Sequence, residues 1–212
     1  MTCKQCQGLE SLFDNKTAAN ELKTYRRKGP DKTTRILIEA LKARGIEAMT
    51  LLDIGGGIGA IQHELMKAGV SEATNVDASM AYIEAAKDEA KRQGFADKVN
   101  YHHGDFVQLA PDIAAVDIVT LDRAICCYHD MPALVGLSAA RARKLYGLVY
   151  PRDVWRIKFG ISIVNFGSRL LRKDYRFFVH PSKAVEAVLD NNGLEQHFYR
   201  KTFLWQVVVY AR

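Results

Sequence analysis

A run of glycines with an aspartate beside it is the clearest chemical signal in this sequence. Residues 51–59 read LLDIGGGIG, with Gly55, Gly57 and Gly59 in alternation and Asp53 two positions before the first glycine. Glycine lets the backbone turn sharply and approach a ligand, and a helix that follows such a loop presents free N–H groups. The segment therefore predicts a loop that binds a nucleotide-like ligand.

Further carboxylates follow at the ends of the next predicted strands. Asp77, followed by Ala78, is placed to hold both hydroxyls of a ribose. Asp105, followed by Phe106, is placed to accept a hydrogen bond from an adenine amino group. NAD-binding oxidoreductases share the ribose carboxylate, so at this point a dinucleotide and S-adenosylmethionine both remain open.

Strands alternate with helices over most of the chain. Asp31 caps a predicted helix that Gly45 ends. Apolar segments predict strands at 50–55, 73–78, 99–106, 115–125 and 146–151, with helices between them and a further helix from Pro181 to Gly193. This alternation indicates a doubly wound α/β sheet of parallel strands. The last two segments, 195–203 and 204–212, predict an antiparallel hairpin at the edge of the sheet.

Four segments in this order, LLDIGGGIG, NVDAS, HHGDF and DIVTLDRAI, resemble the class I S-adenosylmethionine-dependent methyltransferases. The resemblance implies a Rossmann-like seven-stranded sheet of order 3-2-1-4-5-7-6 with strand 7 antiparallel, and S-adenosyl-L-methionine as the cofactor. It also implies that the glycines pass under the methionine part and that Asp77 holds the ribose. By the same resemblance Asp105 and Phe106 border the adenine, while Asp122 and Arg123 lie near the methyl-transfer end.

Three further segments resemble the magnesium-protoporphyrin O-methyltransferases. These are RRKG at 26–29, LDRAICCYHD at 121–130 and YRFFVHP at 175–181. The sequence departs from that family at one point. Where the family has a histidine before the tyrosine, this chain has Cys126 or Cys127, and its histidine follows the tyrosine at position 129.

Candidate catalytic residues lie in two of these segments. His129 could act as a general base, with Tyr128 beside it, or be a loop histidine without a role. Tyr25 precedes the basic run of Arg26, Arg27 and Lys28, which could meet the carboxylate of the cofactor or an anionic substrate, and Arg27 is the predicted cofactor contact. The alternative for the basic run is a solvated helix face.

Two other features allow more than one interpretation. Cys3 and Cys6, with the adjacent pair Cys126 and Cys127, could form a zinc site of four thiolates. The first pair alone is only half of such a site, and adjacent cysteines at a strand end point to opposite faces. We therefore predict no metal and a buried, apolar pair at 126–127. The apolar and basic segment 155–172 could be a packing helix, a lid over the substrate, or a helix on a membrane surface.

Composition sets the remaining expectations. The 212 residues are 48% hydrophobic and 25% charged, with a net charge of +6, which is typical of a globular chain and demands no nucleic-acid partner. No signal peptide or spanning segment is evident, so a cytoplasmic protein is expected.

We divide the chain into an N-terminal helical cap, 1–30, and a methyltransferase domain, 31–212. The expected activity is O-methylation of a small, apolar and anionic molecule, with peripheral membrane contact left open. The alternatives are an NAD-binding oxidoreductase and an RNA or protein methyltransferase.

Overall fold

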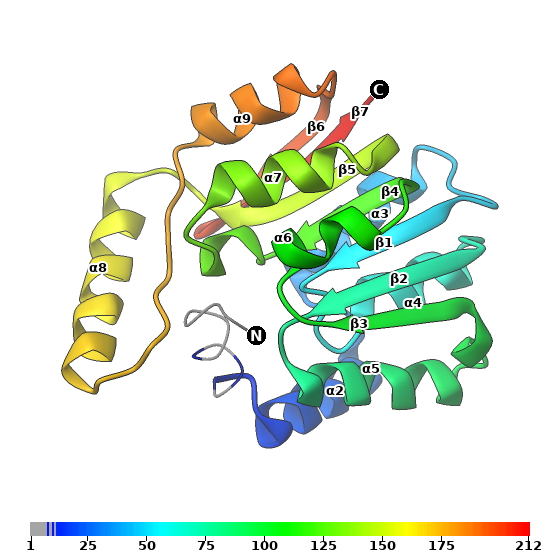
Figure 1. The fold of residues 1–212 in the computed structure, drawn as a ribbon, viewed down its shortest axis with the longest axis horizontal. Helices are drawn as coiled ribbons and strands as arrows, with labels where there is room; N and C mark the ends of the chain where they lie inside the picture. The colour runs from blue at the N-terminus through cyan, green and yellow to red at the C-terminus, as the bar shows by residue number, and fades with distance from the viewer. Residues whose placement is uncertain (1–7, 9, 11) are drawn as a thin grey trace.

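A seven-stranded sheet forms the centre of the computed structural model, which describes residues 8, 10 and 12–212 (Figure 1). The strand order is β3-β2-β1-β4-β5-β7-β6, and β7 runs antiparallel to both of its neighbours while the other pairs are parallel. The predicted fold class, order and antiparallel strand are confirmed. The strands are β1 Thr50–Ile54, β2 Glu72–Asp77, β3 Val99–His103, β4 Val116–Asp122, β5 Ala142–Pro151, β6 Glu195–Lys201 and β7 Trp205–Ala211.

Helices cover both faces of this sheet. One core cluster joins the sheet to α6, α7 and α9, and a second joins its other face to α3, α4 and α5. The helices are α2 Asn15–Lys28, α3 Lys32–Lys42, α4 Ala60–Lys67, α5 Met80–Arg92, α6 Phe106–Leu109, α7 Met131–Ala139, α8 Trp155–Leu170 and α9 Ser182–Asn191. None of the helices among the described residues is long and apolar enough to cross a membrane.

Three strand boundaries differ from the prediction by three residues or more, each for a local reason. The third strand ends at His103 because the Asp105 side chain accepts a hydrogen bond from Val107 N–H and caps α6. The fourth ends at Asp122 because Arg123 takes a left-handed conformation, with φ of 60°. The fifth begins at Ala142, four residues before the predicted start, where exposed charged side chains conceal the strand pattern.

Helix α2 packs beside the sheet, against α5 and the glycine loop. Its residues Ala18, Leu22 and Tyr25 form a small apolar cluster with Ile58 and Tyr82. The preceding chain is held as well, since Ser79 Oγ donates to the Phe13 carbonyl at 2.6 Å. Helix α2 therefore lies over the carboxyl ends of the first strands.

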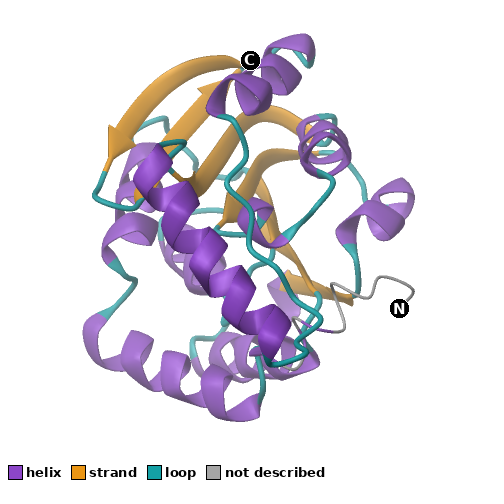
Figure 2. Ribbon diagram, turned by 90° about the vertical axis from the view of Figure 1, so that its left-hand side faces the viewer, coloured by secondary structure: helices purple, strands orange, loops and turns teal. Residues whose placement is uncertain are grey.

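Helix α8 stands apart from the rest of the molecule. In Figure 2 it lies in front of the sheet, on the outside of the fold. Ser168 is its one buried residue. The predicted helical segment 155–172 is therefore present, and it contributes little to the core.

Strand β5 is buried on both faces, which leaves no room for a side chain at Gly147. A Cβ there would lie 2.8 Å from Leu37 Cδ1 and 3.5 Å from Thr120 Cγ2. We expect Gly147→Ala to lower the free energy of unfolding by about 1–3 kcal/mol through overpacking, as measured by urea denaturation. Gly160→Ala is the control, because a Cβ on that α8 residue meets nothing within 4 Å. An equal loss in both variants would contradict the packing argument.

Candidate functional site

A cavity of about 1260 Å³ lies at the carboxyl ends of β1, β2 and β4, beneath α2. Its wall includes the glycine loop, the turn between α2 and α3, and the segments that follow β2, β3 and β4. Phe177 and Trp205 contribute from the C-terminal half. Ligands of doubly wound sheets bind at this edge, so the cavity is the candidate functional site.

The glycine loop approaches its surroundings too closely for other residues. A Cβ at Gly55 would lie 2.9 Å from Ala124 Cβ, and one at Gly56 would lie 2.3 Å from Asn75 Nδ2. Gly55 and Gly57 also have φ of 66° and 55°, in the left-handed region. Gly55 and Gly57 line the cavity as predicted; Gly59 lies outside the lining residues and is the N-cap of α4.

Asp77 ties the end of β2 to this loop. Its Oδ2 accepts from Gly57 N–H at 2.9 Å and its Oδ1 accepts from Ser79 N–H at 2.8 Å. Burial raises the pKa of Asp77, although these two hydrogen bonds oppose the shift. A carboxylate offers about four acceptor sites, so it keeps capacity for a ligand's hydroxyls. Ala78 also lines the cavity at this point.

Asp53 is the buried carboxyl of the site. Thr120 Oγ1 donates to its Oδ1 at 2.7 Å, whereas its Oδ2 has no hydrogen-bond partner. Burial, together with the charges of Asp122 and Asp77, raises the pKa of Asp53 to about 7. A buried acceptor without a partner beside two other carboxylates favours a cationic ligand.

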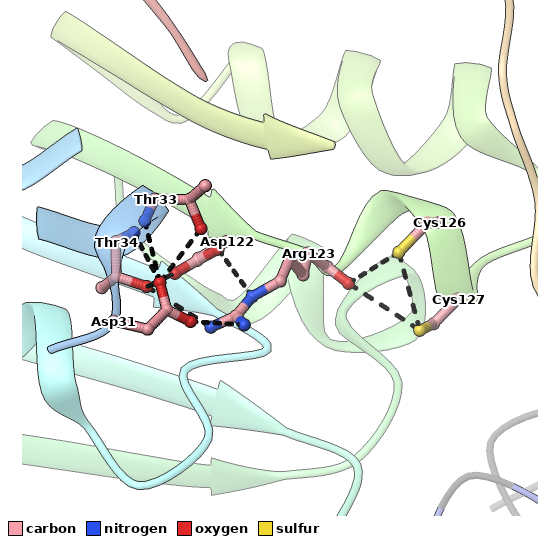
Figure 3. A network of polar contacts seen from close by, with 7 residues as sticks. All are labelled: Asp31, Thr33, Thr34, Asp122, Arg123, Cys126 and Cys127. Atoms are coloured by element: carbon pink, nitrogen blue, oxygen red, sulfur yellow. Dashed lines mark hydrogen bonds and ion pairs between the residues drawn. The ribbon is translucent and has the colours of Figure 1, made fainter. Parts of the chain in front are cut away.

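Arg123 connects the end of β4 with the start of α3 (Figure 3). Its Nε donates to Asp122 Oδ1 at 3.1 Å, and its Nη1 lies 2.6 Å from Asp31 Oδ2. Thr34 Oγ1 donates to Asp122 Oδ2 and also contacts the guanidinium of Arg123. Burial raises the pKa of Asp122, and the neighbouring Arg123 opposes that shift. The network fixes both residues in the cavity wall.

Asp105 and Phe106 line the cavity beside β3. The carboxylate of Asp105 already accepts two hydrogen bonds, from Val107 N–H at 3.0 Å and from Tyr128 Oη at 3.0 Å. Tyr128 is thereby held in the wall of the cavity. Phe106 is buried against the core.

Two of the four remaining predicted residues reach the cavity. Tyr25 and Tyr128 line it, and Arg27 and His129 are outside its lining. Tyr25 Oη donates to Glu64 Oε1 at 2.8 Å, and burial raises the tyrosine pKa above its usual range, so its hydroxyl is a donor and not a base. His129 stacks on Tyr128, with ring centroids 5.2 Å apart.

The cysteine pair differs from the prediction. Cys126 and Cys127 lie on a 3-10 turn after β4, not at a strand end, and both sulfurs turn toward the carbonyl of Arg123 (Figure 3). Their Sγ atoms are 3.9 Å apart, so the expectation of opposite faces is wrong. Both residues line the cavity, Cys126 buried and Cys127 half-buried. Cys3 and Cys6 are outside the described residues, and the described part holds no cluster suited to a metal ion.

Sequence patterns did not reveal the residues that support this site. Thr34 and Thr120 act through their hydroxyls, and Asn75 through its amide, which donates to Gln62 Oε1 at 2.9 Å under the loop. Of the predicted basic run, Lys28 lines the cavity and Arg27 does not. Lys32 was not predicted; its position was the available signal, because Lys28 ends α2 and Lys32 begins α3 on either side of the turn that lines the cavity.

The polar groups fit S-adenosylmethionine better than a dinucleotide. Asp53, Asp77 and Asp122 surround one end of the cavity, where a sulfonium or ammonium group relieves their mutual repulsion. The pyrophosphate of NAD would add negative charge at the same place. Asp77 and the glycine loop remain available for a ribose and for close approach of the ligand.

Comparison with known proteins supports the same assignment. Residues 51–145 match the family described as "Methyltransferase domain". Ribosomal protein L11 methyltransferases from Enterobacter sp. (strain 638) and Dechloromonas aromatica (strain RCB) are 30% and 31% identical over 43% and 47% of this chain. The chain spans 30% and 35% of the length of these two relatives.

Solved structures extend the likeness to nearly the whole chain. Magnesium protoporphyrin IX methyltransferase from Synechocystis PCC 6803 with bound SAH has a TM-score of 0.72 at 16% identity, covering 98% of this chain and 99% of that one. An O-methyltransferase family protein from Burkholderia thailandensis has a TM-score of 0.71 at 14% identity, covering 96% and 62%. The chain thus has the fold of these methyltransferases, and its residues 51–145 match a methyltransferase domain, as the motifs in that segment predict.

Proposed function

We propose that this protein transfers a methyl group from S-adenosylmethionine to an oxygen atom of a small, apolar and anionic molecule. The observation that carries the proposal is the lining of the cavity, which combines buried carboxylates with lysines and aromatic side chains. Asp53 and Asp77 suit the cofactor. The lysines and aromatic side chains suit an apolar, negatively charged acceptor.

Cations and aromatic side chains line the cavity together. Lys28 and Lys32 lie at the α2–α3 turn, and Phe177 and Trp205 supply aromatic surface from the C-terminal half. Ammonium groups favour an anionic acceptor, while the rings favour an apolar body. The volume of about 1260 Å³ exceeds that of most single-ligand pockets and accommodates cofactor and acceptor together.

The residues of the site position the reactants and exclude water. The bound cofactor supplies a sulfonium methyl group that is already activated for in-line displacement, so alignment accounts for most of the acceleration. Helix α2 and its cluster with Ile58 and Tyr82 cover the cofactor end and keep water out. The Arg123 network holds the wall near the expected methyl group.

None of the described lining residues is a histidine, and the hydroxyls of Tyr25 and Tyr128 donate to carboxylates. A carboxylate or phenolate acceptor attacks without a general base, in contrast to a neutral alcohol. An anionic acceptor therefore requires none of these side chains as a base. The relatives that act on ribosomal protein L11 match less than half of this chain, so their acceptor is not carried over.

The first test concerns Asp77. Asp77→Ala removes a carboxylate that we place on the ribose, and the affinity for S-adenosylhomocysteine should fall by about tenfold to a hundredfold in titration calorimetry, since charge-assisted hydrogen bonds contribute ~1.5–3 kcal/mol each. Asp112→Ala, a change at an exposed carboxylate outside the cavity, is the control. An unchanged Kd in Asp77→Ala, or binding of NADH by the unmodified protein, would contradict the proposed cofactor site.

A second prediction follows from the pKa of Asp53, which is about 7 in the folded chain and near 3.8 when unfolded. The folded state binds the extra proton between these values, so stability from Asp53 is present at low pH and is lost as pH rises toward 7. Affinity for the cationic cofactor should rise over pH 6–8, because the ionised carboxylate attracts it. In Asp53→Asn, both the change of stability with pH and the change of cofactor affinity with pH should become smaller. Thermal unfolding measures the first and titration calorimetry the second. Parallel pH profiles in the two proteins would refute this assignment.

The third prediction concerns the two lysines that line the cavity at the α2–α3 turn. The double variant Lys28→Ala/Lys32→Ala should raise the KM of an anionic acceptor about threefold to tenfold and leave the cofactor Kd unchanged. Acceptors are identified with radiolabelled cofactor across apolar carboxylic acids and phenols. Lys23→Ala, on the same helix α2 but outside the cavity lining, is the matched control. A KM that stays within twofold would exclude these lysines from acceptor binding.

A further inference from the structure

Helix α8 exposes a continuous apolar stripe. Its five large members are between 56% and 76% exposed: Trp155, Phe159, Ile163, Phe166 and Leu170. Because an α-helix has 3.6 residues per turn, these positions fall within an arc of about 80°. Exposed apolar residues gathered in this way mark an interaction surface, in contrast to single exposed residues.

The opposite side of α8 faces the protein. Ile157 and Ile161 are half-buried there and Ser168 is buried. The side chain of Asn165 accepts from Phe177 N–H at 2.9 Å and donates to Phe177 O at 2.7 Å. These two hydrogen bonds fix the rotation of the helix against the segment that follows it. The stripe is therefore directed away from the molecule. The helix itself lies on the outside of the fold (Figure 2).

Positive charge borders the stripe, and negative charge is absent from it. Arg156 lies along one side and Lys158 and Arg169 along the other, at the angles that helical geometry gives them. Arg172 and Lys173 follow the helix, and the sequence from 154 to 173 contains no aspartate or glutamate. Lys158 pairs with Asp153 at 2.5 Å, at the start of the helix.

We propose that the α8 stripe docks on the surface of an anionic lipid bilayer, with the helix axis in the plane of the membrane. An apolar face between flanking cations matches acyl chains below anionic headgroups. Association of two copies through α8 would place like charges together. A nucleic acid would leave five large apolar side chains in water. The lipid surface satisfies both the apolar and the charged part of the face.

A second apolar point lies beside the start of α8. Phe203 is 86% exposed in the turn between β6 and β7. Arg152, just before α8, donates from Nη1 to the carbonyls of Thr202 and Phe203 at 3.2 and 3.3 Å. The turn is thus held next to the N-terminal end of α8. Docking does not depend on the methyl acceptor, and it can be tested without an activity assay.

Co-sedimentation with vesicles tests the proposal directly. The full chain is mixed with vesicles of phosphatidylcholine alone or with about 30% phosphatidylglycerol. We expect the bound fraction to rise with the anionic lipid. Phe166→Ser and the double variant Arg156→Glu/Arg169→Glu should each lower the partition coefficient by about tenfold or more. The controls are Met80→Ser, at another exposed apolar residue, and Lys91→Glu/Lys98→Glu on exposed lysines remote from α8.

Tryptophan fluorescence locates the contact. The chain has two tryptophans, and in Trp205→Phe the remaining Trp155 lies on the stripe. Lipids brominated on the acyl chain should quench its emission. The absence of binding to anionic vesicles, equal loss in the control variants, or no quenching of Trp155 would each overturn the proposal. A dimer in gel filtration that Phe166→Ser dissociates would identify a second copy as the occupant and would overturn it as well.

Discussion

Like charges held close together at the end of the central strands determine what this site can bind. Asp53, Asp77 and Asp122 end three neighbouring strands, and partial or complete burial raises the pKa of each. Ionisation is least favourable at Asp53, because one of its oxygens is buried without a hydrogen-bond donor. Parallel strands bring their carboxyl ends to the same edge, so the topology itself concentrates the charge. A cationic ligand at that edge converts the repulsion into binding energy, and a dinucleotide phosphate would increase it.

The basic run at the end of α2 shows how one sequence motif divides into separate roles. Arg26 Nε lies 2.7 Å from Oε2 of Glu89, whose side chain has no exposed surface. Burial alone would raise the pKa of Glu89, but hydrogen bonds from Arg92, Gln93 and Arg26 lower it to about 2. Arg26 therefore attaches α2 to α5, Arg27 faces solvent, and Lys28 reaches the cavity. Successive residues of a helix point about 100° apart, so the three cations face different surroundings. The sequence alone shows three like charges in a row and does not show which of them faces the cavity.

The fold could be predicted because its strongest signals are local. Glycines and aspartates occur at strand ends, and capping by Asp31 and Asp105 follows from side chains that bond to nearby backbone N–H groups. The features that the sequence did not reveal depend on contacts between residues far apart in the chain. The hydroxyl of Thr34 meets Asp122 across 88 positions, and the early start of β5 is supported by pairing with β4. The orientation of Cys126 and Cys127 follows from the left-handed backbone at Arg123, which no propensity predicts for an arginine.

The two edges of the sheet have a consequence for the behaviour of the chain at high concentration. Strand β6 has six of its seven residues exposed, carries charge at Glu195, Arg200 and Lys201, and changes register against β7 between Gln196 and Phe198. At the other edge, β3 is only five residues long. A short or irregular charged edge is a poor template for adding strands from another molecule. Self-association into extended sheets is thus opposed at both edges of the sheet. Most of the large exposed apolar side chains among the described residues lie on α8, where a detergent can cover them.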